Sequence, residues 1–309
     1  LRAARPPGLL IAARGTSDHA ATYAKYLFEI RNRLPVALAA PSAFGLYQAP
    51  PRVGAYCVVG ISQSGASEDI CTVLEESQAQ GALTIALTNR PRSRLGRAAD
   101  HVLPLDAGPE RSVPASKTYT ATLLLVAMLS QALDPDPAFA EALQRTPAAL
   151  ERALRPELDL PPLAHALDGP RLAVLGRGYH LATAQEIALK IMETSYSVAE
   201  ARSVADFLHG PLAIVEPGFA ILLLEAAGPT RRQMRALARQ LGELGARVVT
   251  ISDRPVAGPL ALTLRTGLPE ALTPLPYAIV GQRLALQLAR DRGADPDRPR
   301  SLHKVTSTR

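Results

Sequence analysis

Short apolar runs bounded by turn residues recur along the chain, and they constrain its fold more than any other feature. In the first half they cover residues 9–13, 56–61, 83–87 and 102–105. Continuous runs of this length are typical of strands buried on both faces of a parallel sheet. Amphipathic helical stretches are expected between and after them, at residues 17–28, 68–80 and 118–133. This alternation predicts right-handed βαβ units, and hence a doubly wound α/β fold.

The same pattern restarts in the second half of the chain. Strands are expected at residues 171–175, 219–224 and 248–252, and helices at 182–199, 230–244 and 277–291. The first strand of each half is followed by a glycine turn, Arg14-Gly15-Thr16-Ser17 and Gly176-Arg177-Gly178-Tyr179. A repeat of about 160 residues is too long for a solenoid and indicates two similar domains.

A proline-rich stretch separates the two patterns. It runs from Asp134 to Leu167 and is interrupted by a short helical stretch at 139–154. We therefore expect a first domain over residues 1–135, a connecting segment over 136–168, a second domain over 169–292 and a C-terminal arm over 293–309.

A cluster of serines follows the second predicted strand of the first half. It reads Ser62-Gln63-Ser64-Gly65-Ala66-Ser67, whereas the second half has Ala226-Ala227-Gly228-Pro229-Thr230 at the matching place. A loop that opens a helix presents free N–H groups and the positive end of the helix dipole. One serine would be read as a helix cap, but three in six residues predict a phosphate site, confined to the first half. Thr16 and Ser17 repeat this pattern one strand earlier.

The densest charged segment is the helical stretch around Lys190. Glu186, Lys190 and Glu193 are spaced to share one helix face, which by itself is typical of an exposed, salt-bridged stripe. Two observations favour a functional interpretation. Only four of the 34 basic residues are lysines, and Leu208-His209-Gly210-Pro211 follows shortly afterwards. A carboxylate and an imidazole suit proton transfer near neutral pH.

The C-terminal arm carries the last lysine. Its composition, from Asp295 to Thr306, is that of a disordered tail. Lys304 nevertheless follows a proline-stiffened segment, and lysine is the side chain that forms a Schiff base with a sugar carbonyl.

Several function classes are excluded by the sequence. Gly176-Arg177-Gly178 lacks the third glycine of a dinucleotide motif and no P-loop occurs, so we assign neither NAD nor ATP, and no metal or other cofactor. The net charge of +6 comes from scattered arginines with few aromatics, which argues against nucleic acid. No apolar run reaches the roughly 20 residues that span a bilayer, so we expect a cytoplasmic protein without membrane contact.

Together these segments resemble the sugar isomerase (SIS) domain family, in particular the isomerase half of glutamine:fructose-6-phosphate amidotransferases. The resemblance rests on six stretches that run in order from one end of the chain to the other. They are Gly15-Thr16-Ser17, Ser62-Gln63-Ser64-Gly65, Ser116-Lys117, Ala188-Leu189-Lys190 through Glu193, Leu208-His209-Gly210-Pro211, and Asp297-Arg298-Pro299-Arg300 with Lys304.

This resemblance implies a role for each candidate residue. Glu193 would move the proton between C1 and C2 of a hexose phosphate, His209 would open the ring, and Lys304 would form the Schiff base. Lys190 would lie near the sugar oxygens, and Glu186 would support the site. The phosphate and the rest of the substrate would be bound by Thr16, Ser17, Ser62, Gln63, Ser64, Ser67 and Val113. In the family the histidine comes from a neighbouring subunit, which implies a homodimer.

The sequence also departs from the family. Arg14 replaces a small residue and Pro114 precedes the Ser116 motif, so the accepted sugar could differ. No glutaminase domain with its cysteine nucleophile is recognised, which favours deamination of glucosamine 6-phosphate to fructose 6-phosphate and ammonia. The alternatives are a deglycase for a phosphorylated fructosyl-amino acid, a non-catalytic sugar-phosphate regulator, and a subunit that receives ammonia from a separate glutaminase.

Overall fold

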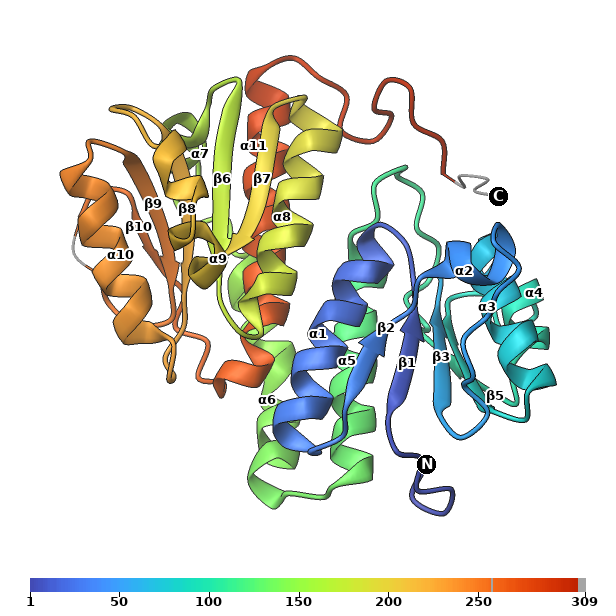
Figure 1. The fold of residues 1–309 in the computed structure, drawn as a ribbon. Coiled ribbons are helices and arrows are strands. Elements are labelled where there is room, and N and C mark those ends of the chain that lie inside the picture. The colour runs from blue at the N-terminus through green and yellow to red at the C-terminus, as the bar shows by residue number, and fades with distance from the viewer. Residues whose placement is uncertain (257, 305–309) are drawn as a thin grey trace. The chain divides into compact units, whose positions relative to one another are not determined.

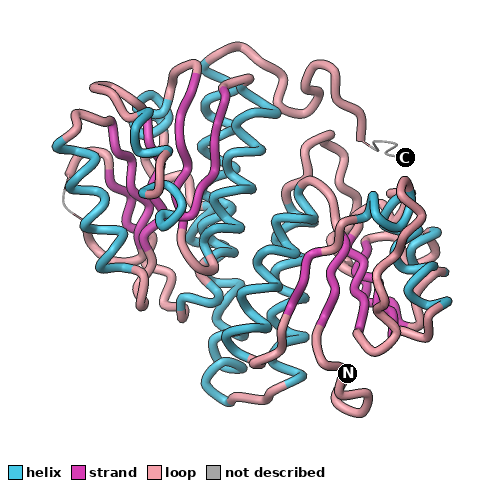
Figure 2. The backbone as a smooth tube through the Cα atoms, in the orientation of Figure 1, coloured by secondary structure: helices cyan, strands magenta, loops and turns pink. Residues whose placement is uncertain are grey.

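The computed structural model describes residues 1–256 and 258–304, and the chain divides into two compact units. Of the described residues, the first unit contains 1–111, 115–135 and 302–304, and the second contains 112–114 and the described part of 136–301. Each unit is built on one parallel sheet with helices on both faces (Figures 1 and 2). The expected doubly wound α/β fold is confirmed in both halves.

The first sheet has the order β2-β1-β3-β4-β5. Its strands are β1 (Leu9–Ala12), β2 (Val36–Leu38), β3 (Cys57–Ile61), β4 (Leu83–Thr88) and β5 (His101–Pro104). Its helices are α1 (Thr16–Arg31), α2 (Pro41–Gly45), α3 (Glu68–Ala79), α4 (Arg94–Arg97) and α5 (Lys117–Leu133). One core cluster joins Leu10 and Val58 of the sheet to Ile70 and Leu74 of α3, so β1 and β3 are covered from that side.

The second sheet repeats this order as β7-β6-β8-β9-β10. Its strands are β6 (Arg171–Gly176), β7 (Val198–Ser203), β8 (Ala220–Glu225), β9 (Arg247–Ser252) and β10 (Ala261–Thr263). Its helices are α6 (Pro137–Leu154), α7 (Pro161–Leu167), α8 (His180–Ser195), α9 (Val204–Leu208), α10 (Arg231–Glu243) and α11 (Pro274–Asp291), with short 3-10 turns η1 (Pro211–Ile214) and η2 (Glu270–Leu272). The matching order confirms the internal duplication.

Successive residues of the central strands of this sheet face opposite cores, as the two-residue repeat of a strand requires. Leu172 and Leu222 pack in a cluster with α6, α7, α8 and α11. Leu175 and Leu223 pack in a second cluster with α9 and α10. Both faces of β6 and β8 are therefore apolar, which explains why their sequences are continuous hydrophobic runs.

The expected elements are found with small shifts at their ends, and three strands escaped prediction. β2, β7 and β10 all lie at sheet edges. β2 and β10 are only three residues long, and β7 carries Glu200 and Arg202. Edge strands are exposed on one side and use short or charged sequences, so they lack a continuous apolar run. For the same reason the helix expected over residues 182–199 was too long: it ends at Ser195, and Val198 begins β7.

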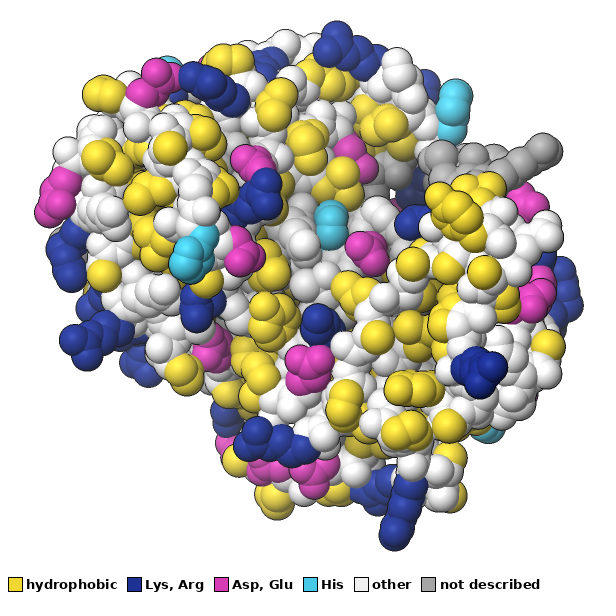
Figure 3. Space-filling view, in the orientation of Figure 1, with side chains coloured by type: hydrophobic (Ala, Val, Ile, Leu, Met, Phe, Trp, Pro, Cys, Tyr) yellow, Lys and Arg dark blue, Asp and Glu magenta, His cyan; other side chains and the backbone are white. Residues whose placement is uncertain are grey.

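Basic side chains are spread over the surface. On the face seen in Figure 3, Lys and Arg residues alternate with acidic and apolar ones and gather in no single patch. Among the described residues, no helix is both long and apolar enough to cross a membrane.

Candidate active site

The serine cluster forms the loop between β3 and α3, at the carboxyl end of a central strand. Ser62 is almost fully buried, and its hydroxyl accepts a hydrogen bond from the Gly65 N–H at 3.2 Å. The hydroxyls of Ser62 and Ser67 lie 3.2 Å apart, and Ser64 accepts from the Ala66 N–H at 3.3 Å. The three serines therefore shape the turn that opens α3, and its N-terminal N–H groups carry the positive end of the helix dipole.

Gly65 is required in this turn. Its φ of +61° lies in the left-handed region, and a Cβ at this position would meet the Ser93 hydroxyl at 1.9 Å. The loop is also tied down by backbone hydrogen bonds. The Leu95 N–H donates to the Gly65 carbonyl at 3.1 Å, and the Asn89 N–H donates to the Gln63 carbonyl at 3.2 Å. The loop is thus fixed in place before any ligand arrives.

A pocket of about 700 Å³ opens beside this loop. It is lined by Ser64 and Ala66 on one side and by residues 89–93, which follow β4, on the other. Arg90 and Arg92 place positive charge at its rim. An anion in this pocket would therefore meet the hydroxyls of Ser64 and Ser93 and two guanidinium groups.

Thr16 and Ser17 begin α1, directly after β1. Because β1 and β3 are adjacent and parallel, their carboxyl ends lie at the same edge of the sheet. An ion pair between Arg14 and Asp69 joins this opening to α3, with Nε and Oδ2 2.7 Å apart. Asp69 is buried, and its partnership with Arg14 was not predicted because the two residues are 55 positions apart.

The N-terminus of α5, at Ser116-Lys117-Thr118, already binds a carboxylate of the protein itself. Glu110 accepts from the Ser116 N–H at 3.0 Å and also bonds the hydroxyl of Thr118. Sequence reasoning missed this residue, because it caps the helix from a loop rather than from the usual position directly before it. The donors at the start of α5 are therefore used within the first unit.

In the second unit, α8 carries the charged triad that the spacing predicted. Lys190 Nζ lies 2.5 Å from Glu193 Oε2 and 3.5 Å from Glu186 Oε1. The Glu186 side chain is fully buried, that of Lys190 is 4% exposed and that of Glu193 is 20% exposed. The exposed-stripe interpretation is excluded by this burial, since charged groups are taken out of water only when paired. Glu193 is the one member of the triad that solvent or substrate can reach.

The two carboxylates keep Lys190 protonated. Burial by itself would lower the pKa of this lysine, but the charges of Glu186 and Glu193 and their hydrogen bonds outweigh it, and its pKa lies above 10.5. An ammonium group cannot attack a carbonyl, so Lys190 acts here as a fixed positive charge and hydrogen-bond donor.

Glu193 lies near the C-terminal end of α8, which is at the amino edge of the second sheet. The end of the helix is tied to the start of β6: the Ser197 hydroxyl donates to the Gly169 carbonyl at 2.7 Å. Tyr196 follows in a left-handed conformation. Its hydroxyl accepts the Arg300 N–H at 3.1 Å, and the Arg300 guanidinium stacks 4.0 Å from its ring centroid. The C-terminal arm is therefore anchored three residues after Glu193, by a tyrosine that the sequence did not single out.

The remaining predicted residues lie on other elements of the two units. His209 follows α9 and is exposed. The Val113 N–H donates to the Asp297 carbonyl at 3.0 Å, so this residue supports the arm through its backbone. Lys304 is half-buried and belongs to the first unit.

The structure brings Glu186, Lys190 and Glu193 together in one unit, and Ser62, Ser64 and Ser67 in the other. In the part of the chain described, no group of three or more His, Cys, Asp or Glu residues could hold a metal ion.

The two tandem halves share one doubly wound α/β topology, with a serine-rich helix opening in the first and a buried lysine–carboxylate triad in the second. The chain belongs to the SIS domain family, whose model matches residues 4–132 and 167–261.

Individual relatives agree with this assignment. A glutamine–fructose-6-phosphate aminotransferase (isomerizing) from Methanothermobacter thermautotrophicus is 33% identical over 97% of this chain and 51% of its own length. The chain thus spans about half the length of the curated relatives it matches. A "putative phosphosugar isomerase" from Silicibacter pomeroyi superposes with a TM-score of 0.87 at 36% identity, over 96% of this chain and 90% of that one. A glucosamine-6-phosphate deaminase from Thermotoga maritima shares the fold, with a TM-score of 0.81 at 21% identity, over 98% and 91% of the two chains.

Proposed function

We propose that the chain is an enzyme that interconverts the aldose and ketose forms of an amino-sugar 6-phosphate. The reaction we assign is glucosamine 6-phosphate plus water giving fructose 6-phosphate and ammonia. The observation that carries the proposal is the burial of Lys190 between Glu186 and Glu193, which leaves Glu193 as a carboxylate reachable from solvent beside a fixed positive charge.

Isomerisation needs a base that takes a proton from one sugar carbon and returns it to the next. We assign that task to Glu193, because a partly exposed carboxylate held by a single lysine has a fixed position and a free oxygen. Lys190 would stabilise negative charge that develops on the sugar oxygens, while Glu186 neutralises the lysine from the buried side.

The other groups would act at the two ends of the substrate. Ser62, Gln63, Ser64 and Ser67, with Thr16 and Ser17, would bind the phosphate through hydroxyl and backbone donors. His209 would open the sugar ring from a second copy of the chain, which makes the active form a homodimer and agrees with the exposure of this residue. Lys304, at the end of the arm anchored by Arg300, would form the Schiff base with the ketose.

The test is to incubate the purified protein with glucosamine 6-phosphate and to measure ammonia and fructose 6-phosphate. We expect both products in equal amounts. Glu193→Gln should lower kcat by about 10²–10⁴-fold, the usual contribution of a general base, with KM nearly unchanged. Glu243→Gln, an exposed carboxylate of α10, is the matched control and should retain full activity.

Two outcomes would replace this proposal. Binding of the sugar phosphate without any release of ammonia would make the chain a sugar-phosphate regulator. Turnover of a phosphorylated fructosyl-amino acid in preference to glucosamine 6-phosphate would make it a deglycase. Loss of substrate binding in Glu193→Gln would remove that residue from the chemistry.

A further inference from the structure

The second unit contains a pocket that the proposed reaction does not use. It has a volume of about 900 Å³ and lies at the carboxyl ends of β8, β9 and β10, between the loops that follow these strands and the first half of α6. Ligands of parallel α/β sheets bind at this edge, where loops diverge from the strand ends. The pocket therefore occupies a favourable place for a ligand, in the half of the chain that lacks the serine loop.

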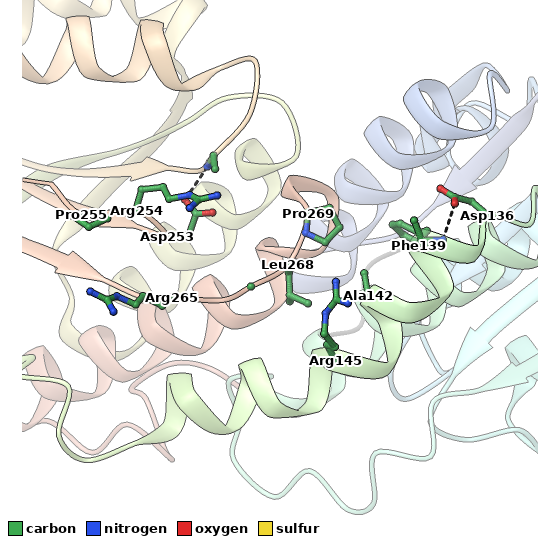
Figure 4. A pocket seen from close by; sticks show the side chains of 13 residues that line it. Asp136, Phe139, Ala142, Arg145, Asp253, Arg254, Pro255, Arg265, Leu268 and Pro269 are labelled. Atoms are coloured by element: carbon green, nitrogen blue, oxygen red, sulfur yellow. Dashed lines mark hydrogen bonds between the residues drawn. The ribbon is translucent and has the colours of Figure 1, made fainter.

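Three arginines supply the positive charges of this pocket. Arg254 and Arg265 come from the loops after β9 and β10, and Arg145 approaches from α6 (Figure 4). The side chains of Arg254 and Arg265 make no hydrogen bond or ion pair with any residue that the structure describes. Arg145 pairs with Glu141 of its own helix. Two guanidinium groups are thus available to an incoming anion.

The carboxylates of the pocket are already engaged. Asp253 is buried and accepts the Ala227 N–H at 2.8 Å, and Asp136 accepts the Ala138 N–H at 2.9 Å at the start of α6. Glu225 lies beneath the neighbouring surface and is neutralised by Arg231 and Arg235, at 2.8 and 3.0 Å. Both aspartates keep their negative charge and formally balance Arg254 and Arg265, so what the pocket offers an anion is the unpaired guanidinium donors of these two arginines.

Apolar side chains form the remaining wall. Phe139 and Ala142 of α6 face Leu268 and Pro269 of the loop after β10 (Figure 4). Phe139 and Leu268 are largely buried in the protein, so they offer a firm surface rather than mobile side chains. Arginines opposite an apolar wall suit a ligand that has an anionic group at one end and a flat apolar group at the other.

The pocket is remote from Glu193. α8 begins at the carboxyl edge of the sheet and ends at the amino edge, and Glu193 follows His180 by 13 positions, which corresponds to about 20 Å of helix. A small molecule in the pocket could not touch the Glu186–Lys190–Glu193 triad. Its ligand is therefore not the molecule on which Glu193 would act.

We propose that this pocket is a second anion site, which binds an organic phosphate bearing an aromatic or apolar group. Arg254 and Arg265, whose side chains extend in different directions in Figure 4, would turn to donate guanidinium hydrogen bonds to the phosphate, and Phe139 with Leu268 would pack against the apolar group. The site differs from the serine-loop pocket, where Ser64 and Ser93 hydroxyls accompany Arg90 and Arg92 and the lining contains no aromatic side chain such as Phe139. The two sites should therefore select different phosphates.

The experiment measures binding of phenyl phosphate and of pyrophosphate by calorimetry, and it does not depend on catalysis. Three variants are compared with the unmodified chain: Arg254→Ala with Arg265→Ala, Ser62→Ala with Ser64→Ala, and the matched charge control Arg52→Ala with Arg232→Ala. Both control arginines are exposed and neither lines the pocket.

We expect phenyl phosphate to bind the unmodified chain more tightly than pyrophosphate. This binding should survive in the serine variant and in the control, and weaken at least tenfold in the Arg254/Arg265 variant. Phe139→Ala should weaken phenyl phosphate but not pyrophosphate. Binding that is lost with the serines and retained without the arginines would overturn the proposal, and so would equal weakening in the charge control or no binding at millimolar concentration.

Discussion

The two halves of this chain share one scaffold and use opposite ends of it. In both sheets the strands follow the same order, and each first strand leads through a glycine turn into a long helix. The first half concentrates hydroxyls at the carboxyl edge, in the loop from Ser62 to Ser67. The second half carries its buried charges near the far end of α8, at the amino edge, where Lys190 lies between two carboxylates. Duplication has preserved the topology and left the chemistry free to differ.

In each half a glutamate precedes the last helix, Glu110 before α5 and Glu270 before α11, and the two glutamates have different hydrogen-bond partners. Glu110 caps α5 directly, through the N–H of Ser116. Glu270 instead accepts the Thr230 hydroxyl at 3.0 Å, and its Oε2 lies 2.1 Å from where a Cβ on Gly228 would be. Glu270 therefore fills space against the loop after β8, which corresponds to the serine loop after β3. In the second half the Glu270 carboxylate therefore lies beside this loop, whereas in the first half we propose that a phosphate binds at the matching loop.

Removing the positive charge of Lys190 should give the largest loss in the free energy of unfolding. Lys190→Met leaves Glu186 buried beside Glu193 without a positive charge, and breaking a buried pair in this way costs about 3–5 kcal/mol. Urea unfolding followed by circular dichroism at neutral pH should show this loss. Lys117→Met, at the exposed first residue of α5 in the first half, should cost under about 1 kcal/mol, as a surface substitution does.

The pH dependence tests the same comparison further. Because the folded pKa of Lys190 is raised, the stability it adds is fully present below pH 10.5 and disappears as pH rises through its folded pKa. The difference between the unmodified chain and Lys190→Met should accordingly shrink in that range. Lys190→Met with Glu186→Gln should recover part of the loss; no recovery would mean that the buried charge is not its cause.

Disturbing the turn at Gly65, in the loop from Ser62 to Ser67, should lower the free energy of unfolding by an intermediate amount. Gly65→Ala introduces a Cβ 1.9 Å from the Ser93 hydroxyl at a φ of +61°, and we expect a cost of about 1–3 kcal/mol with weaker binding of phosphate. Gly81→Ala is the control, because its φ of +84° imposes the same backbone strain with nothing within 4 Å of the new Cβ. Equal losses of stability in both variants would show that the contact with Ser93 is unimportant.

The smallest effect is expected at Glu270. Burial raises the pKa of its carboxyl above 4.5, the Thr230 hydrogen bond opposes this, and Asp253 adds to it. Stability linked to this group is fully present below pH 4.5 and is lost as pH rises through the higher folded pKa. Glu270→Gln keeps an acceptor for Thr230, so it should change stability at pH 7 by under about 1 kcal/mol and flatten the acid side of the profile. If Glu270→Gln left the pH dependence of stability at acid pH unchanged, the raised pKa of Glu270 would be contradicted.

Much of the fold was predictable because buried central strands have continuous apolar sequences. Residues 9–12 and 220–224, for example, are apolar on both faces of the sheet, and a chain with this pattern has few alternatives. Three of the four edge strands were not predicted, because β2 and β10 are only three residues long and β7 carries charged residues. The Glu186, Lys190 and Glu193 spacing predicted one helix face, but spacing alone did not decide whether that face is buried.

The sequence by itself determined the doubly wound fold, its duplication and the serine cluster that only one half possesses, because these depend on local composition and its period. Only the tertiary structure decided which polar groups are satisfied by distant partners: Arg14 by Asp69, the start of α5 by Glu110, and Tyr196 by Arg300. It also decided that the triad is buried and that Arg254 and Arg265 line one pocket. Such contacts join residues far apart in the chain, and burial depends on what packs over a helix face rather than on the residues that form it.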